Sequence, residues 1–191
     1  MQTIQQSGLA EQTINKSRFV AFAAHCANER EVVQMLRKLA SEHPHAHHLA
    51  FAYQLKTPDG LVQRMNDAGE PTGTAGRPIL QHIEGQKLLN VCVGVIRYYG
   101  GINLGTGGLA RAYGGTAKLA LDAARLVPFV EMGEVRLEMD YASFDSFSRE
   151  LEKLNGRILD KQFDANVRVL ASVPVNDIAA LQGKYQLRKA G

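Results

Sequence analysis

Glycine is concentrated in one part of this chain: twelve of the 18 glycines lie between residues 66 and 115. Glycine loses more conformational entropy on folding than other residues, so it is favoured where backbone turns tightly or closely approaches another group. These glycines gather mainly before and after the apolar run 91–96. The pattern predicts a buried strand with a glycine-rich loop on either side, hence a site built largely from backbone.

The rest of the composition indicates a folded cytoplasmic protein. Apolar residues make up 45% of the 191 residues, which is too high for a disordered chain. No stretch reaches 18 consecutive apolar residues, and the first residues lack the basic start and apolar centre of a secretory signal. We therefore expect a cytoplasmic location and no membrane partner. Cys26 and Cys92 lie among apolar neighbours and are expected to be reduced core thiols.

Charge differs between the two parts of the chain. Residues 1–130 carry 13 Lys and Arg against 9 Asp and Glu, a net charge of +4. Residues 131–191 carry 9 against 10, a net charge of −1. A basic part is consistent with an anionic partner, although an ordinary solvated surface explains the same excess.

Hydrophobic periodicity predicts two α+β domains, over residues 1–130 and 131–191. The first combines strands at 19–26, 48–55, 61–65 and 91–99 with a helix after Asn28 and helices at 77–89 and 108–125. The second has the order strand 135–141, helix 144–154, strands 157–163 and 167–173, and helix 174–188. This βαββα order in about 60 residues is typical of a ferredoxin-like antiparallel sheet with its helices on one face.

Two long blocks carry a family resemblance. DAGEPTGTAGRPIL (67–80) and VIRYYGGINLGTGGLARAY (95–113) resemble the signature of the IMPACT/YigZ family, and INKSRFV (14–20) is similar to an earlier block. The tail is similar to the small C-terminal domain of the bacterial YigZ-like branch. The resemblance implies a first domain with the fold of a small-subunit ribosomal protein and of domain IV of elongation factor G. It also implies a cytosolic, non-catalytic protein linked to translation.

The segment 105–110 fits the pattern GxGxxG/A between a strand and a helix. In dinucleotide-binding folds such glycines bring a pyrophosphate to a helix N-terminus. The acidic residue expected at the end of a following parallel strand is missing, because Asp122 falls inside the predicted helix, so a dinucleotide is not expected. Two interpretations remain open: backbone N–H groups that hold a phosphate or carboxylate, or glycines that allow close helix–strand packing.

Metal binding and catalysis are not expected. Asp67 and Glu70 form an acidic pair without a third acidic ligand nearby. Asp67 is expected to accept backbone hydrogen bonds in its own turn, and Glu70 to orient the loop or pair with an arginine. The histidines at 43, 45, 47 and 48 are interrupted by Pro44, which disfavours a convergent set of zinc ligands. The sequence contains no GxSxG motif, and both cysteines lie in largely apolar segments, which do not suggest an activated thiol. We therefore expect no catalytic residues, no metal and no cofactor, with a small hydrolase as the least favoured alternative.

Arginine beside aromatic residues is the strongest indication of binding. Arg97 is followed by Tyr98 and Tyr99, and such a group can pair with phosphate and stack on bases or peptides. If the two glycine-rich loops meet, Arg77 and Arg111 join Arg97 around one cleft within residues 66–113. RNA or the ribosome is the expected partner, and a protein partner in a stress or translation pathway is the alternative. The site residues so predicted are His48, Asp67, Glu70, Thr72, Thr74, Arg77, Arg97, Tyr98, Tyr99, Gly100, Gly101, Gly105, Gly107, Gly108, Arg111 and Tyr113.

Overall fold

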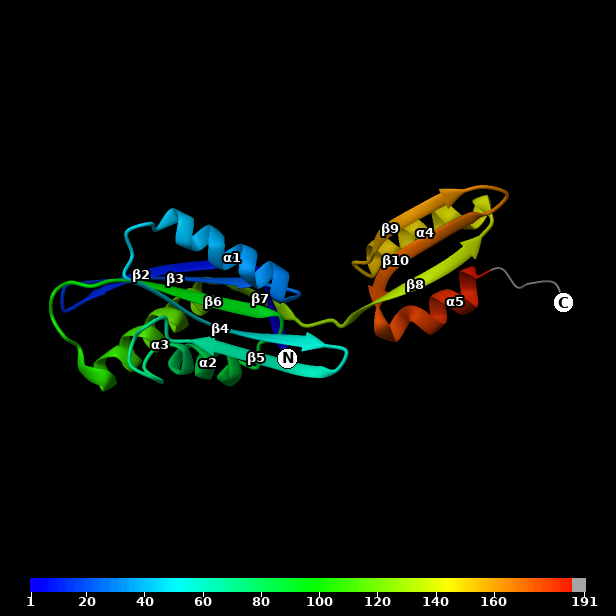
Figure 1. The fold of residues 1–191 in the computed structure, drawn as a ribbon. Helices are drawn as coiled ribbons and strands as arrows, with labels where there is room; N and C mark the ends of the chain where they lie inside the picture. Colours follow the sequence, from blue (N-terminus) through cyan, green and yellow to red (C-terminus); the bar gives the residue numbers. More distant parts are fainter. Residues whose placement is uncertain (187–191) are drawn as a thin grey trace. The chain divides into compact units, whose positions relative to one another are not determined.

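The computed structural model describes residues 1–186 and divides the chain into two compact units, Met1–Phe129 and Val130–Gly191 (Figure 1). Each unit has its own antiparallel sheet, its own helices and its own hydrophobic core. The two-part α+β fold expected from the sequence is therefore confirmed. No helix among the described residues combines the length and the apolar character that crossing a membrane requires.

The first unit is built on a five-stranded sheet with the strand order β2-β3-β6-β4-β5, in which every neighbouring pair is antiparallel. Its elements in chain order are β1 (Gln2–Gln6), β2 (Gly8–Ile14), β3 (Ser17–His25), α1 (Glu29–Glu42), β4 (His48–Thr57), β5 (Gly60–Asn66), α2 (Gly76–Gly85), β6 (Val91–Tyr98), α3 (Gly105–Ala123) and β7 (Arg125–Pro128). The central strand β6 is buried over its first seven residues, which is why its sequence is almost continuously apolar.

Helices cover both faces of this sheet. Figure 1 shows α1 on one side and α2 with α3 on the other. The core beneath α2 and α3 includes Ile79, Leu121 and Tyr113, whereas α1 contributes Val32 and Leu39 to the opposite face. The helix α1 begins where the sequence predicts, because the Asn28 side chain accepts a hydrogen bond from the Glu31 backbone N–H.

The first strands and the last strand of this unit were not predicted. The strands β1 and β7 pair with each other in a separate two-stranded ribbon, while β2 forms an edge of the main sheet. Only Ile4 of β1 and Gly8 of β2 are buried, so their sequences lack a strong apolar pattern. A Cβ atom at Gly8 would lie 1.9 Å from the Ala120 carbonyl oxygen, so this glycine lets α3 pack directly on β2.

The second unit has the predicted βαββα order. Its elements are β8 (Met132–Met139), α4 (Tyr141–Lys153), β9 (Arg157–Phe163), β10 (Val167–Pro174), a 3₁₀ turn at Val175–Asp177 and α5 (Ile178–Tyr185). The strand order is β8-β10-β9, and both helices share one core, where Phe147 of α4 and Tyr185 of α5 meet edge to face with ring centroids 5.4 Å apart.

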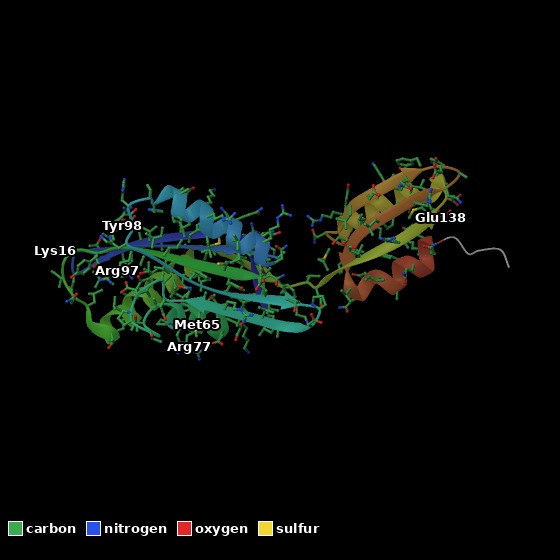
Figure 2. The ribbon with its side chains drawn as sticks, viewed as in Figure 1. Lys16, Met65, Arg77, Arg97, Tyr98 and Glu138 are labelled. Atoms are coloured by element: carbon green, nitrogen blue, oxygen red, sulfur yellow. The ribbon has the colours of Figure 1, made fainter. Side chains whose placement is uncertain are left out.

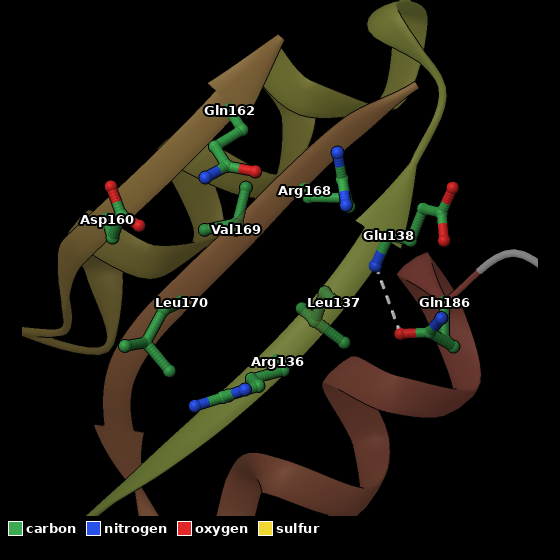
Figure 3. Close-up of a pocket in the computed structure, with 9 residues that line it drawn as sticks. All are labelled: Arg136, Leu137, Glu138, Asp160, Gln162, Arg168, Val169, Leu170 and Gln186. Carbon is green, nitrogen blue, oxygen red and sulfur yellow. Dashed lines mark hydrogen bonds between the residues drawn. The ribbon is translucent and has the colours of Figure 1, made fainter. Parts of the chain in front are cut away.

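The opposite face of this smaller sheet carries polar side chains around a shallow hollow (Figure 3). Arg136 and Glu138 of β8, Arg168 and Leu170 of β10, and Asp160 of β9 contribute to its lining. Positive and negative groups are mixed there, and the Glu138 backbone N–H donates to the Gln186 side-chain oxygen at 3.1 Å. This surface was not predicted from the sequence.

Several predicted boundaries need correction. Helix α2 ends at Gly85 and not at residue 89, because Lys87 and Asn90 adopt left-handed backbone conformations. Helix α3 begins at Gly105, three residues before the predicted start. The final helix begins only at Ile178, after the 3₁₀ turn, and the last two residues of the predicted range 174–188 lie outside the described residues.

Candidate functional site

The glycine-rich loops meet other segments at one end of the five-stranded sheet, which we call the loop end. Strands β2 and β5 finish there, strands β3 and β4 start there, and β6 finishes between them. The turn 15–16, the segment 43–47 and the loops 67–75 and 99–104 therefore come together. Figure 2 shows Lys16 and Arg97 at this end. Helices α2 and α3 also begin there, each directly after one of the loops.

Asp67 fastens the first loop to the start of α2. Its carboxylate accepts backbone N–H groups from Gly73 at 2.9 Å, Ala75 at 3.0 Å and Gly76 at 2.8 Å. Burial favours the neutral carboxyl, but these three donors together outweigh it and hold the pKa of Asp67 below its ordinary value. Asp67 thus caps the helix and fixes the loop, and its oxygens are already occupied.

Glu70 forms the centre of a buried polar cluster. Its Oε1 lies 2.7 Å from Nη1 of Arg97 and accepts a 2.7 Å hydrogen bond from the Tyr113 hydroxyl. The side chains of Arg97 and Glu70 are each only 5% exposed. Burial, together with the hydrogen bond to Glu70, raises the pKa of Tyr113 far above its ordinary value, so its hydroxyl remains a donor.

Arg97 therefore has a different role from the one expected. Its guanidinium is held by Glu70, lies 3.3 Å from the Ser17 hydroxyl, and stacks near the rings of Phe19 and Tyr99 with centroid distances of 5.6 and 5.1 Å. Only its buried Nε lacks a partner. A guanidinium held in this way positions the surrounding loops and does not reach out to an anion.

The histidine predicted at this site, His48, lies against the same cluster. Its Nδ1 is 2.8 Å from the Ala68 carbonyl oxygen and therefore donates to it, which leaves Nε2 at 3.8 Å from Glu70 Oε1. His43 bonds the Tyr98 hydroxyl, and His47 Nδ1 accepts the Tyr99 backbone N–H. Among residues 1–186 no three His, Cys, Asp or Glu side chains are grouped as metal ligands would be.

The second loop relies on close backbone contact. A Cβ atom at Gly100 would lie 2.1 Å from the carbonyl carbon of Lys16, and the Gly100 N–H donates to Ser17 at 3.2 Å. Gly101 and Gly105 have φ angles of +83° and +68°, which glycine adopts readily. Helix α3 then starts without a side-chain cap, so the N–H groups of its first residues, up to Gly107, have no intrahelical partner.

Three exposed cations belong to segments that begin at the loop end: Lys16 in the turn, Arg77 in the first turn of α2 and Arg111 in the second turn of α3. None of them takes part in the ion pairs found within residues 1–186. Lys16 was missed because a lysine in a tight turn looks ordinary in sequence. It has a left-handed backbone, at φ +64°, and its main chain lies against Gly100 of the second loop. The three predicted arginines thus divide into one buried arginine and two exposed ones.

The other predicted site residues also divide into exposed and buried ones. Tyr99 is 40% exposed, and Thr72 is exposed. Thr74 is buried, with its hydroxyl bonded to the Pro71 carbonyl, and Tyr98 is half-buried against His43. The site can therefore be described as an internal polar cluster beneath an exposed surface of cations, one tyrosine and free backbone N–H groups.

Comparison with known proteins identifies both units. Residues 15–121 match the Impact N-terminal domain, and residues 137–184 match a domain of unknown function, DUF1949. An IMPACT family member of Haemophilus influenzae is 35% identical over 95% of this chain and 88% of its own length. The IMPACT family member YigZ of Escherichia coli is 33% identical over 90% of this chain and 84% of its own. A solved structure titled as a hypothetical protein covers 99% of this chain and 98% of its own, with 27% identity and a TM-score of 0.72.

Proposed function

Because this chain belongs to the IMPACT family, we propose that it is a non-catalytic binding protein linked to translation, which contacts RNA through the loop end of its first unit. The observation that carries the proposal is the position of two exposed cations beside the uncapped start of α3: Arg111 on α3 itself and Lys16 in the turn that contacts Gly100. Arg77 is a further exposed cation, at the start of α2. The contact would be made mainly with phosphate groups, so the proposal includes ribosomal RNA as well as free RNA.

Electrostatics at the loop end favours an anion. The aligned peptide dipoles of a helix place partial positive charge at its N-terminus, and both α2 and α3 begin here. Asp67 offsets this charge at α2, because its carboxylate accepts N–H groups there, and Glu70 is paired with Arg97, so the charge at the uncapped start of α3 is the one that remains. The surface left for a ligand is thus basic, although the loops themselves contain carboxylates.

Tyr99 supplies the aromatic part of the proposed contact. The Arg97 guanidinium lies over the Tyr99 ring. The Tyr99 hydroxyl donates a hydrogen bond to the Asn103 side-chain oxygen at 3.0 Å. The ring is held in place yet remains 40% exposed. A fixed, partly exposed aromatic ring beside cations is the arrangement with which single-stranded RNA-binding proteins stack a base.

A titration of labelled single-stranded oligouridine at several salt concentrations tests the proposal. Replacement of Lys16, Arg77 or Arg111 by Ala should weaken binding and reduce the salt slope by about 0.7–1 for each lost phosphate contact. Tyr99→Ala should cost about 1–3 kcal/mol with little change in slope. Arg30→Ala is the matched control, since Arg30 is an exposed arginine of α1 at the opposite end of the sheet.

The outcomes separate the proposal from its alternatives. Equal losses for Arg30→Ala and the loop-end variants would indicate nonspecific attraction to a basic surface. Unchanged affinity and slope in all loop-end variants, with the proteins still folded, would exclude this surface as an RNA site.

A further inference from the structure

Strand β2 has an unpaired edge. It is the first strand in the order β2-β3-β6-β4-β5 and pairs only with β3. The ribbon of β1 and β7 forms a separate sheet and adds no strand beside it. Among the described residues, the backbone groups of Leu9, Glu11 and Thr13 make no hydrogen bond in turns, loops or caps. An unpaired strand edge presents a row of donors and acceptors to which another extended chain can bind.

The turn after β2 fixes which backbone groups face this edge. Asn15 and Lys16 both have positive φ, and Ile14 is paired with Ser17, so the hairpin closes with a two-residue loop. In such a hairpin the closing pair is hydrogen-bonded, and bonded and non-bonded pairs then alternate along the strands. The register of β2 with β3 runs without a bulge. The N–H and C=O groups of Leu9, Glu11 and Thr13 therefore point outward.

A hollow lies on each face of the sheet beside this edge. On the α1 side, a hollow of 260 Å³ is lined by Leu9, Val20, Phe22 and the α1 residues Met35 and Leu39. The charges at its rim neutralise one another, because Arg18 pairs with Glu11, and Lys38 pairs with Glu42. This hollow therefore suits an uncharged apolar side chain.

The hollow on the α3 side has a different chemistry. It measures 480 Å³ and is lined by Gln12 and Ile14 of β2 and by Gly108, Arg111 and Leu119 of α3, among others. Arg111 is the one charged group in this lining, and it has no ion-pair partner among residues 1–186. A carboxylate is the side-chain group that pairs best with a guanidinium.

We propose that the β2 edge binds an extended peptide segment of a partner protein in which apolar and acidic residues alternate. Side chains of a strand point alternately to the two faces of a sheet, so every second residue would enter each hollow. The backbone of the peptide would bond Leu9, Glu11 and Thr13, its apolar side chains would meet the α1-side hollow, and its carboxylates would approach Arg111. This surface overlaps the proposed RNA contact only at the start of α3, through Gly108 and Arg111.

The test uses a fluorescent decapeptide of alternating valine and glutamate with the full-length protein. Binding should slow hydrogen exchange at the Leu9, Glu11 and Thr13 amides. N-methylation of one alternate set of peptide residues should abolish binding, whereas methylation of the other set should leave it unchanged, because only one set of N–H groups faces β2. Methylation at the valines would block a peptide that binds antiparallel to β2. Methylation at the glutamates would block a peptide that binds parallel to β2.

Two protein variants and one control complete the test. Leu9→Asp, at a side chain that is 63% exposed, and Arg111→Ala should each weaken peptide binding about tenfold. Leu61→Asp is the matched control, because Leu61 is a 53% exposed leucine on β5, the opposite edge strand, and this change should have no effect.

Three outcomes would overturn the peptide proposal. These are no binding at millimolar peptide, equal effects of the two methylation patterns, or equal losses in Leu9→Asp and Leu61→Asp. Protection of the β2 amides by oligouridine in place of the peptide would be a fourth such outcome, because it would assign this edge to RNA. RNA binding that is unaffected by Leu9→Asp would leave the proposed function intact even if the peptide proposal failed.

Discussion

The two glycine-rich loops of the first unit are held in different ways. The loop 67–75 is fixed by carboxylates: Asp67 bonds three backbone N–H groups, and Glu70 bonds Arg97 and Tyr113. The loop 99–104 is held by close backbone contact with the turn at Lys16, and the helix that follows it has no side-chain cap. The first loop uses up its polar groups internally, whereas the second leads to N–H groups that remain available.

This difference shows that charged residues in a glycine-rich segment need not bind a ligand. Glu70 and Arg97 neutralise each other in a buried place and thereby hold β6 and the first loop together. Anion binding can then come only from the exposed cations and from the start of α3. The following predictions test whether the internal cluster and the exposed surface are separate in this way.

The largest effect is expected for Glu70→Ala. The change leaves Arg97 as a buried charge without its partner and removes the acceptor of the Tyr113 hydroxyl, so the free energy of unfolding should fall by about 3–5 kcal/mol. Denaturant unfolding followed by circular dichroism measures it. Glu42→Ala breaks an exposed pair with Lys38 and should cost well under about 1 kcal/mol. Similar losses in the two variants would mean that the buried cluster does not stabilise the unit.

Much of the fold follows from the sequence because apolar periodicity reports burial. The βαββα order of the second unit and the central strand β6 were predicted on this basis and are confirmed by the structure. Strands β1, β2 and β7 escaped detection because they lie in a ribbon or at a sheet edge, where few side chains are buried. The same edge position leaves the backbone of β2 unpaired, so the part that was hardest to predict is also the one proposed to bind a peptide.

The sequence predicts that Asp67 accepts backbone hydrogen bonds and that Glu70 can pair with an arginine, and the structure has both contacts, but the sequence does not predict which arginine Glu70 binds. The spacing of glycines and arginines indicated that the loops around β6 form one site. Which arginine is buried depends on Glu70 reaching Arg97 across 27 positions of sequence, and no local pattern reports that contact. Lys16 was overlooked for the same reason, because it joins the site only through the pairing of β3 with β2 and with β6.

The second prediction concerns the backbone contact that holds the second loop. Gly100→Ala would place a Cβ atom 2.1 Å from the Lys16 backbone, so the turn or the loop must shift, at a cost of about 1–3 kcal/mol. In Gly107→Ala the nearest atom is the flexible end of Arg111 at 3.4 Å, and the residue is helical. This control should therefore stabilise the protein by up to about 1 kcal/mol. Thermal unfolding of both variants checks the prediction, and a stable Gly100→Ala protein would contradict the proposed close contact.

The smallest effect is expected for Asp67→Asn and depends on pH. The amide has only one acceptor oxygen, so at neutral pH the variant should lose about 1 kcal/mol of capping energy. The folded pKa of Asp67 is lowered, so in the wild type the carboxylate contributes stability above the unfolded pKa and loses that contribution as the pH falls through the folded value. Asparagine does not titrate, and the stability difference between the two proteins should therefore shrink in acid. Urea unfolding at pH 7 and at about pH 3 measures this difference, and a gap that stays constant would show that Asp67 does not hold the first loop through its charge.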